Sequence, residues 1–396
     1  MHLKLSRPLK QMKLIYLAID VDYPGFHGGS THVGEATDSL VKMCDTVYLV
    51  CKWRAGQKLL EKKQNKIIIR VPSINIPVLR MILYFLSSWM IAVFLILSKQ
   101  VDVVYERARI FGGGGIVAGH LLNRKTIYEI IEPYIIIPVI QGTIKKNSWV
   151  EREMVGWHKY IGARASRVTT THKSAIDGIN PNKVLFIHTG ANPEKFKPMN
   201  ADDIRKKYAL TREKTLLYIG SFTEWHACEA MIKATAQMVK KDKKVKLMMI
   251  GHGQQYNLSI RLAERLGVLG NVIFVGKISM EQVPKYINAA DVCFALFDRR
   301  YPPFKKLGYY YSPIKIHEYK ACAKAIIASR YPQIKELVKQ NVNGLLVDET
   351  KVDEVTKAVK ILLRNPKLAQ KMGKKNREEV EKIYNWDYFN EKILEN

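Results

Sequence analysis

The chain has 396 residues, of which 47% are hydrophobic and 25% are charged, as in ordinary globular domains. This length and composition predict two or three folded domains and exclude a disordered tail protein, a collagen and a coiled coil. The 64 basic residues outnumber the 36 acidic residues, so the formal net charge is +28. We therefore expect an anionic partner, which is a nucleic acid, an acidic phospholipid or a diphosphate ligand.

The cysteines and the N-terminal segment both fit a cytoplasmic protein. Five cysteines are too few, and odd in number, for a disulfide framework, and none lies in a CxxC pair of the kind that binds zinc. The basic N-terminus is followed by about six apolar residues, fewer than the roughly 7–15 of a signal peptide. Residues 13–19 are instead expected to form a first β-strand.

Two short motifs follow this strand. Asp20 and Asp22 match a DxD pattern that can hold a divalent metal, but two carboxylates alone make a sparse site, and we expect no bound metal. Residues 25–33 read GFHGGSTHV, in which Gly28 and Gly29 open a helix and let backbone N–H groups approach a phosphate. The alternative is a tight turn that needs glycine, because the loop lacks the GxGxxG dinucleotide pattern.

An apolar segment from Met81 to Ser98 carries no charge over its 18 residues, near the lower length limit for crossing a bilayer. Its position between two expected strands predicts the crossover helix of a βαβ unit, which packs on its own sheet. Packing needs only one apolar face, so three arrangements stay open: a buried helix, a helix whose outer face touches the membrane interface, and a span. Basic charge upstream favours the interface, because anionic headgroups attract it. The residues expected at an acceptor or membrane surface are Lys52, Arg54, Lys58, Lys62, Lys63 and Trp89.

Short β-rich runs alternate with helix-length segments along the whole chain, which predicts parallel sheets covered on both faces. The expected strands are 13–19, 46–51, 67–71, 101–105, 126–129, 167–170, 184–187, 215–219, 246–250, 272–275, 292–296, 325–328 and 344–347. Because thirteen strands in one open sheet would be unusual, we expect two doubly wound domains, 1–192 and 193–379. A helix at 380–396 is expected to pack back on the first domain.

Ligands of such sheets bind where loops follow the carboxyl ends of strands. Phe111 precedes four consecutive glycines, which suggest a close backbone approach or a flexible loop. Glu129 lies at a strand end and Glu132 in the loop beyond, where a carboxylate can orient a sugar hydroxyl; a solvated loop charge is the alternative. In the second half, Gly220 with Ser221, and Gly251, follow two further strands.

The segment 309–329, YYYSPIKIHEYKACAKAIIAS, is the most informative. Ser312 as N-cap and Pro313 as first residue predict a helix start, with the helix ending near Ala323. Lys315 then lies in the first turn, where a cation is unfavourable unless an anion is near, and Glu318 shares its face. This pair can hold a diphosphate and ribose hydroxyls; a plain i,i+3 ion pair is the alternative.

The ordered segments GGSTH, YIGSF, IGHG, NVIFVGKI, AADVCFALF and SPIKIHEYKACAKAIIAS together resemble the retaining glycosyltransferases of family 4. The resemblance covers essentially the whole chain and is strongest in the second half. It implies the α/β GT-B fold, with two Rossmann-like doubly wound parallel-sheet domains facing a central cleft. It also implies a nucleotide-diphosphate sugar donor on the C-terminal domain, an acceptor on the N-terminal domain, and no metal or other cofactor.

The resemblance carries over to individual donor-binding residues, with departures. Glu318 matches the second carboxylate of the family's E-x7-E pattern and would hold the ribose, whereas the first position is Tyr310. Ser221 and His226 stand where the family usually has the Arg and Lys that clamp the diphosphate.

The helix start replaces this missing charge in our interpretation. Lys315, together with Ser312, Pro313 and Ile314, is expected to stabilise the departing diphosphate, so that Lys315, Glu318 and Glu129 are the predicted catalytic residues. Glu129 occupies about the strand end at which the family often carries a catalytic histidine.

The resemblance thus predicts a metal-independent glycosyltransferase that retains the anomeric configuration. Its acceptor would be membrane-associated (a lipid-linked sugar, a lipid or a surface glycan), and the protein would lie on the cytoplasmic face of the membrane. A GT-B nucleotide-sugar epimerase and a catalytically inactive sugar-nucleotide-binding homologue are the alternatives. A nucleic-acid-binding protein is disfavoured, because the chain has no RNP, KH or zinc-finger pattern.

Overall fold

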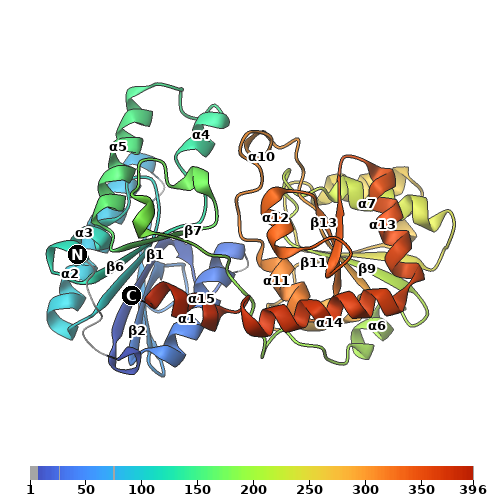
Figure 1. Cartoon of the computed structure of the whole chain (residues 1–396), viewed down its shortest axis with the longest axis horizontal. Coiled ribbons are helices and arrows are strands. Elements are labelled where there is room, and N and C mark those ends of the chain that lie inside the picture. The colour runs from blue at the N-terminus through green and yellow to red at the C-terminus, as the bar shows by residue number, and fades with distance from the viewer. Residues whose placement is uncertain (1–7, 26, 75, 396) are drawn as a thin grey trace. The chain divides into compact units, whose positions relative to one another are not determined.

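The computed structural model describes residues 8–25, 27–74 and 76–395 and divides the chain into two compact units (Figure 1). The first unit comprises Met1–His188, Tyr310–Ser312 and Trp386–Asn396, and the second comprises Thr189–Tyr309 and Pro313–Asn385. The first passage between units thus lies a few residues before the predicted boundary at 192/193. Phe26 of the glycine loop and the basic segment 1–7 lie outside the described residues.

The first unit contains an eight-stranded sheet in the order β3-β4-β2-β1-β5-β6-β7-β8. All neighbouring strands are parallel except β3 and β4. The strands are β1 Lys13–Asp22, β2 Thr46–Lys52, β3 Leu60–Lys63, β4 Lys66–Val71, β5 Val103–Arg107, β6 Lys125–Ile130, β7 Arg167–Thr170 and β8 Val184–Phe186.

Helices cover both faces of this sheet, because its strands carry apolar side chains on both sides. The helices are α1 Gly28–Met43, α2 Pro77–Lys99, α3 Gly114–Leu121, α4 Ile136–Ile140, α5 Trp149–Arg164 and α15 Trp386–Leu394, with short 3-10 turns at Leu9–Gln11, Lys173–Ala175 and Pro181–Lys183. One apolar core joins α1 and α15 to the sheet, and another joins α2 and α3 to its opposite face. Figure 1 shows α15, in dark red, beside α1.

The second unit contains a six-stranded, wholly parallel sheet in the order β11-β10-β9-β12-β13-β14. Its strands are β9 Lys214–Ile219, β10 Val245–Ile250, β11 Val272–Gly276, β12 Val292–Ala295, β13 Ala325–Ser329 and β14 Gly344–Val347. Its helices are α6 Asp202–Lys207, α7 Cys228–Val239, α8 Tyr256–Arg265, α9 Val283–Ala289, α10 Pro302–Leu307, α11 Ile314–Ala321, α12 Pro332–Leu337, α13 Val352–Arg364 and α14 Pro366–Lys382, with a 3-10 turn at Leu269–Asn271.

The predicted α/β class and its thirteen strands are confirmed, with strand ends shifted by about three residues or fewer. The sequence analysis missed β3, because Leu60–Lys63 is a short, largely charged edge strand without apolar alternation. It pairs antiparallel with β4.

The predicted start of the helix after Ser312 is wrong by one residue. The helix α11 begins at Ile314, and Pro313 is an extended N-cap residue without a side-chain hydrogen bond. Ser312 lies outside the helix because the segment Tyr310–Ser312 packs with the first unit. The helix ends at Ala321, and Ala323 adopts a left-handed conformation with φ of 54°.

Of the three arrangements left open for the segment 81–98, the structure excludes the fully buried helix. Only 22% of the apolar window in α2 is buried, although its inner side, with Ala92, Leu95 and Ile96, belongs to the core on the sheet. Among the described residues, Val78–Lys99 is the one helix long and apolar enough to cross a membrane by length and composition.

Candidate active site

The second sheet reverses its strand order between β9 and β12. At such a switch point the connections leave the two strands toward opposite faces, and a ligand can bind between them at the carboxyl ends. Gly220 follows β9, and Gly251 follows β10. The helix α11 leads from the β12 connection into β13, so its N-terminus lies at the same edge of the sheet.

Two of the predicted glycines are required by the backbone at this edge. Gly220 has φ of 154° and Gly251 has φ of 127°, both in the region that side chains disfavour. A Cβ atom on Gly251 would lie 1.9 Å from the carbonyl oxygen of Gly220. The two loops therefore approach each other backbone to backbone, and their N–H groups are already used: that of Gly220 donates to the carbonyl oxygen of Ile250 at 3.0 Å, and that of Gly251 to the carbonyl oxygen of Gly276 at 2.8 Å.

Lys315, in the first turn of α11, extends to this point. A Cβ atom on Gly220 would lie 2.6 Å from its Nζ, which sits 4.5 Å from the ring centre of Tyr218 and 5.5 Å from that of Phe297. The ammonium nitrogen is buried and has no hydrogen-bond partner in the structure. Aromatic faces stabilise a cation only in part, so this ammonium group is suited to an anionic ligand.

Burial lowers the pKa of Lys315 to about 7, although Cys228 and Glu318 act in the opposite direction. Glu318 is itself 7% exposed. One residue further along α11, the Tyr319 hydroxyl accepts a hydrogen bond of 3.0 Å from the backbone N–H of Ile219. This bond fixes the helix start against the end of β9, so the position of Lys315 is set by the fold.

Neither residue at the two positions where the family usually clamps the diphosphate provides a positive charge. Ser221 is exposed, and its carbonyl oxygen accepts the Tyr218 hydroxyl at 2.6 Å. His226 shares a hydrogen bond of 2.9 Å with the Thr223 hydroxyl. Burial and the nearby Lys315 hold the pKa of His226 well below its ordinary value, so this imidazole is neutral near pH 7.

The remaining predicted donor residues divide between the units. Pro313 and Ile314 start α11 in the second unit, whereas Tyr310 and Ser312 group with the first. Tyr310 is 1% exposed, and its carbonyl oxygen accepts the Thr171 hydroxyl at 2.9 Å. The structure therefore brings Gly220, Gly251 and Lys315 together, but gives Tyr310 no open surface.

The first sheet has its own switch point, between β1 and β5. The helix α1 begins there at Gly28, and a Cβ atom on this residue would meet nothing within 4 Å. Next to it, Arg107 at the end of β5 donates a hydrogen bond of 3.4 Å to the carbonyl oxygen of Gly29. A helix N-terminus beside an arginine suits an anionic group. Arg107 was not among the residues predicted from the sequence.

The DxD carboxylates each pair with cations. Asp20 forms an ion pair with Arg109, and Asp22 lies 2.7 Å from both His27 and Arg54. Within residues 8–25, 27–74 and 76–395, no group of three or more His, Cys, Asp or Glu side chains is arranged to hold a metal ion. Arg54, predicted at a membrane surface, therefore contacts Asp22, the last residue of β1.

Glu129 is held inside the first unit, which does not suit the catalytic role predicted for it. Its carboxylate accepts hydrogen bonds of 2.9 Å from the Tyr16 hydroxyl, the Tyr105 hydroxyl and His32 Nε2. It is 3% exposed, and although burial opposes ionisation, His32, Arg107 and Tyr16 lower its pKa to about 2. Glu129 is thus a buried, ionised carboxylate that accepts three hydrogen bonds from neighbouring side chains.

Glu132, just after β6, is the accessible carboxylate at this edge. It accepts a hydrogen bond of 2.6 Å from the Tyr311 hydroxyl and lies 3.7 Å from Arg109. Its side chain is 32% exposed. The sequence analysis placed Glu132 in the loop, but the neighbours Arg109 and Tyr311 come from distant segments and gave no motif.

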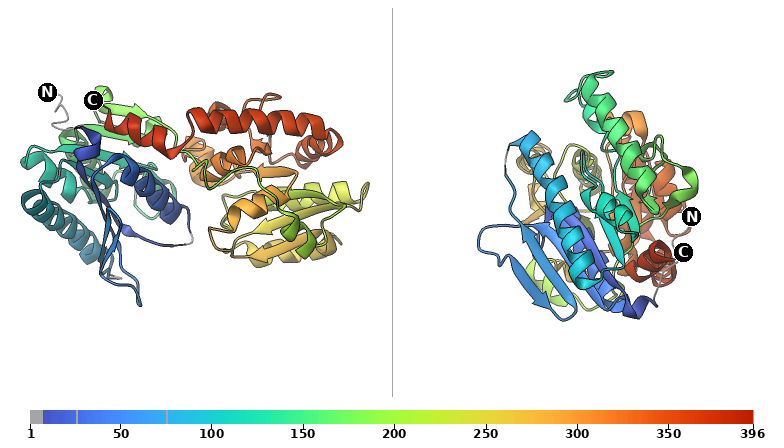
Figure 2. Two further views of the ribbon diagram at one scale, coloured as in Figure 1. Left: turned by 90° about the horizontal axis from the view of Figure 1, so that it is seen from below. Right: turned by 90° about the vertical axis from the view of Figure 1, so that its left-hand side faces the viewer.

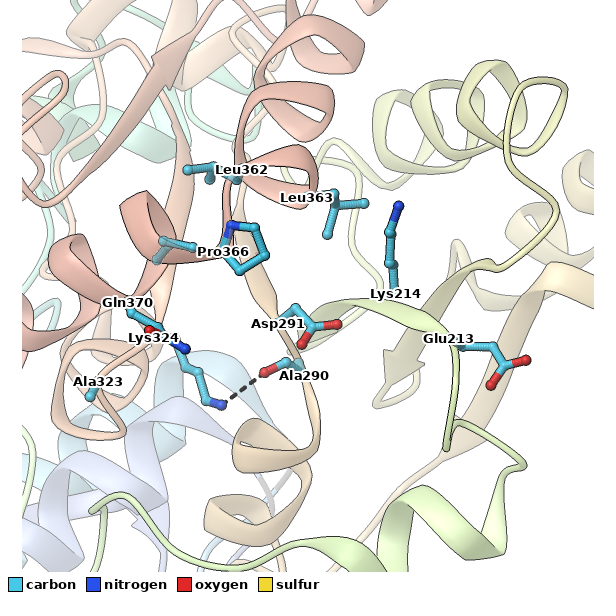
Figure 3. A pocket seen from close by; sticks show the side chains of 12 residues that line it. Glu213, Lys214, Ala290, Asp291, Ala323, Lys324, Leu362, Leu363, Pro366 and Gln370 are labelled. Atoms are coloured by element: carbon cyan, nitrogen blue, oxygen red, sulfur yellow. Dashed lines mark hydrogen bonds between the residues drawn. The ribbon is translucent and has the colours of Figure 1, made fainter.

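A separate pocket of about 350 Å³ lies at the opposite edge of the second sheet (Figure 3). It is lined at the amino ends of β9, β12 and β13 by Lys214, Asp291 and Lys324, and by Leu362, Leu363 and Pro366 between α13 and α14. None of the predicted donor residues lines it, and the Lys324 ammonium donates instead to the carbonyl oxygen of Ala290 at 2.8 Å.

Comparisons with known proteins show which proteins this chain resembles. The family model described as "Glycosyl transferases group 1" matches residues 200–379. An uncharacterized glycosyltransferase of Methanocaldococcus jannaschii is 23% identical over 398 residues, an alignment that covers 96% of each chain. A GDP-mannose-dependent alpha-(1-6)-phosphatidylinositol monomannoside mannosyltransferase of Mycobacterium tuberculosis is 26% identical over 215 residues, which is 53% of this chain and 54% of that protein.

Among solved structures, Anabaena HepE in complex with UDP and glucose aligns with a TM-score of 0.72 at 15% identity, covering 97% of this chain and 98% of that one. This likeness gives the two-sheet GT-B fold. Residues 200–379 match the model of the glycosyl transferases of group 1, and the protein is a glycosyltransferase with the GT-B fold.

Proposed function

We propose that this protein transfers a sugar from a nucleotide-diphosphate sugar to a hydroxyl group of a membrane-associated acceptor, with retention of the anomeric configuration and without a metal ion. The observation that carries this proposal is Lys315, a buried ammonium group without a hydrogen-bond partner at the switch point of the second sheet. A buried, unpaired charge is costly, and a diphosphate would supply its missing partner.

The donor is expected to lie across the carboxyl ends of β9 and β10. Gly220 and Gly251 carry no side chain that would fill this edge, and the N-terminus of α11 provides backbone N–H groups beside Lys315. As the glycosidic bond to the diphosphate breaks, negative charge grows on the phosphate oxygen. Lys315 and the helix N-terminus stabilise that charge more in the transition state than in the ground state.

The proton of the acceptor hydroxyl would pass to the departing phosphate oxygen on the face where the new bond forms. This route fits retention, and it fits the occupied hydrogen-bonding positions of Glu129, the predicted catalytic carboxylate. Glu132, partly exposed and oriented by Tyr311, is the candidate to hold an acceptor hydroxyl. The carboxylates of Asp20 and Asp22, engaged by arginines, support chemistry without a metal.

The choice of donor and acceptor is supported by the compared proteins. The mycobacterial relative is named for GDP-mannose and a phosphatidylinositol mannoside, and the HepE structure holds UDP and glucose. A net charge of +28 also favours an anionic, membrane-bound acceptor.

The experiment is a thermal-shift panel of UDP-, GDP- and dTDP-sugars, because a ligand raises stability by mass action. We expect one nucleotide class to raise the unfolding temperature of the wild type, and Lys315→Met to lose most of the rise. The matched control is Lys324→Met, which removes a second largely buried lysine at the opposite edge of the same sheet. A panel without any shift, or an undiminished shift in Lys315→Met, would refute the donor site.

Retention and acceptor class need product analysis. The responding donor is incubated with EDTA and with a lipid extract, and the anomeric configuration of the new linkage is read by NMR. Release of an epimerised sugar nucleotide in the absence of any acceptor would instead identify an epimerase.

A further inference from the structure

The outer face of α2 is an unusual surface for a protein in water. Nine exposed apolar side chains recur along it at helical spacing: Val78, Leu79, Ile82, Leu83, Leu86, Trp89, Met90, Phe94 and Leu97. Phe94 and Leu97 remain 62% and 66% exposed. Contiguous apolar patches of this kind mark a partner or a membrane, because soluble proteins rarely leave them uncovered.

The same helix is firmly attached to the protein along its other side. Ala92, Leu95 and Ile96 pack with residues of β1, β2 and β5 in one core, and the Ser88 hydroxyl is turned into the helix at 2.8 Å from the carbonyl oxygen of Tyr84. A helix that spans a bilayer would have to leave this sheet. The outer face is therefore suited to lie in the plane of a surface, and Figure 2 (right) shows α2 at the front of the first unit.

The edge strand β3 extends this face and adds positive charge. Leu60 pairs with Ile69 and Lys62 with Ile67, and directly paired residues point to the same side of a sheet. Because Ile67 and Ile69 pack against the core under α2, Leu60 and Lys62 lie on the α2 side. Leu60 is 65% exposed.

Charge complementarity selects the occupant. The 23 residues of α2 include Arg80 and Lys99 and no acidic residue. Lys62 adds a third cation, whereas Glu61 alternates to the other side of β3, where it pairs with Arg70 and Lys63. An apolar strip flanked by these three cations matches the interface of an anionic bilayer, where acyl chains and phosphate headgroups meet.

We propose that the outer face of α2, together with Leu60 and Lys62, docks the first unit in the plane of an anionic lipid bilayer. The acyl-chain boundary takes Leu86, Trp89 and Phe94, and the headgroups take Lys62. The inference rests on the proposed function in one respect only: it takes the bilayer to be the place where the enzyme binds its acceptor.

The test is co-sedimentation of the full-length protein with vesicles of phosphatidylcholine alone or with one quarter phosphatidylglycerol. We expect binding to the anionic vesicles, weakened by 0.5 M salt, and at least tenfold weaker binding for the double variant Leu86→Asp/Phe94→Asp. Leu258→Asp, an equally apolar and exposed position in the second unit, is the matched control and should bind as the wild type does.

A pair of charge reversals on one strand tests the orientation. Lys62→Glu should weaken binding about fivefold or more, since each headgroup contact of a lysine is worth about 1 kcal/mol, whereas Lys63→Glu on the opposite side should have a smaller effect. Trp89 should be quenched by lipids brominated near the headgroup more than by lipids brominated at the chain ends. Deep quenching would indicate a span and overturn the in-plane arrangement.

Three outcomes would overturn the inference: no sedimentation of the wild type with anionic vesicles, equal binding by Leu86→Asp/Phe94→Asp, or a wild-type dimer in solution that this variant makes monomeric. The last would make the face an interface between copies. The nucleotide-sugar thermal shift is measured on each variant and should be unchanged. Vesicle binding without any nucleotide response would refute the proposed function and leave the docking surface standing.

Discussion

Lys315 combines three properties that are individually unfavourable: burial, a position in the first turn of a helix, and the absence of a hydrogen-bond partner. We expect Lys315→Met to weaken binding of the responding nucleotide sugar about 10- to 100-fold, because a hydrogen bond to a charged group contributes about 1.5–3 kcal/mol. The sugar diphosphate does not titrate near pH 7, so the wild-type affinity should fall as the pH rises above about 7 and free Lys315 loses its proton. Calorimetry between pH 6 and 9 checks this.

The Lys315→Met variant supplies the control for that pH profile, since it should bind weakly and nearly independently of pH. Parallel profiles for variant and wild type would show that another group titrates. A wild-type affinity that increases with pH would contradict the assignment.

Glu129 gives a second prediction for a single residue, which concerns the stability of the fold and not the binding of a ligand. Its pKa of about 2 lies below the ordinary value of 4.5, so it contributes stability that is fully present above about pH 4.5 and is lost as the pH falls toward 2. We expect Glu129→Gln to destabilise the protein by about 3 kcal/mol at pH 7, as for other broken buried charge networks. The free energy of unfolding of this variant should also fall less steeply than that of the wild type as the pH drops below about 4.5. Urea unfolding at pH 7 and pH 4 measures both effects.

Turnover per folded molecule separates a structural from a catalytic Glu129. A Glu129→Gln protein that keeps wild-type stability but loses turnover would restore the catalytic role. Glu132→Gln is the companion variant, since its carboxylate is partly exposed and its loss should raise the KM for the acceptor with little effect on stability.

The helix α15 shows how much one element contributes to the first unit. Trp386, Phe389, Ile393 and Leu394 are each at most 2% exposed, and the Asn390 amide donates to the carbonyl oxygen of Ala36 at 2.9 Å. Deletion of residues 386–396 should cost more than about 5 kcal/mol, because each buried apolar side chain contributes about 1.5–3 kcal/mol. Limited proteolysis should then cut the first unit and spare the second, whereas an equally resistant first unit would contradict this docking.

Sequence patterns predicted the strands and helices well where the pattern lies within one continuous segment of the chain. The buried strands appear as apolar runs, and the glycines after β9 and β10 mark the edge of the proposed donor site in the sequence itself. The start of α11 was misplaced because serine followed by proline satisfies the capping rules, while the first-unit packing of Tyr310–Ser312 is a long-range effect. The environment of Glu129 depends on Tyr16, Tyr105 and His32, which no single segment could reveal.

The exposure of α2 is a third case of a long-range effect. Its composition fits a core helix, an interfacial helix or a span equally well. Only the packing of one side against the sheet, together with the exposure of the other side, excludes the fully buried helix.

For the whole molecule, two units with separate cores predict unfolding in more than one step. The five cysteines report on each unit independently, because all are buried free thiols. Cys44 and Cys51 belong to the first unit, and Cys228, Cys293 and Cys322 to the second. Each reacts with a thiol reagent only when its own unit opens.

We expect the responding nucleotide sugar, at about 100 times its Kd, to slow labelling of the three second-unit cysteines up to about 100-fold, since that concentration adds about 2.7 kcal/mol of stability to the state that binds it. Cys44 and Cys51 should be slowed far less, because Lys315 and the glycines of the proposed donor site belong to the second unit. Pulsed labelling with mass spectrometry measures all five sites in one sample. Equal protection in both units would show that they open together or that both hold the donor, whereas protection confined to Cys44 and Cys51 would move the donor site to the first unit.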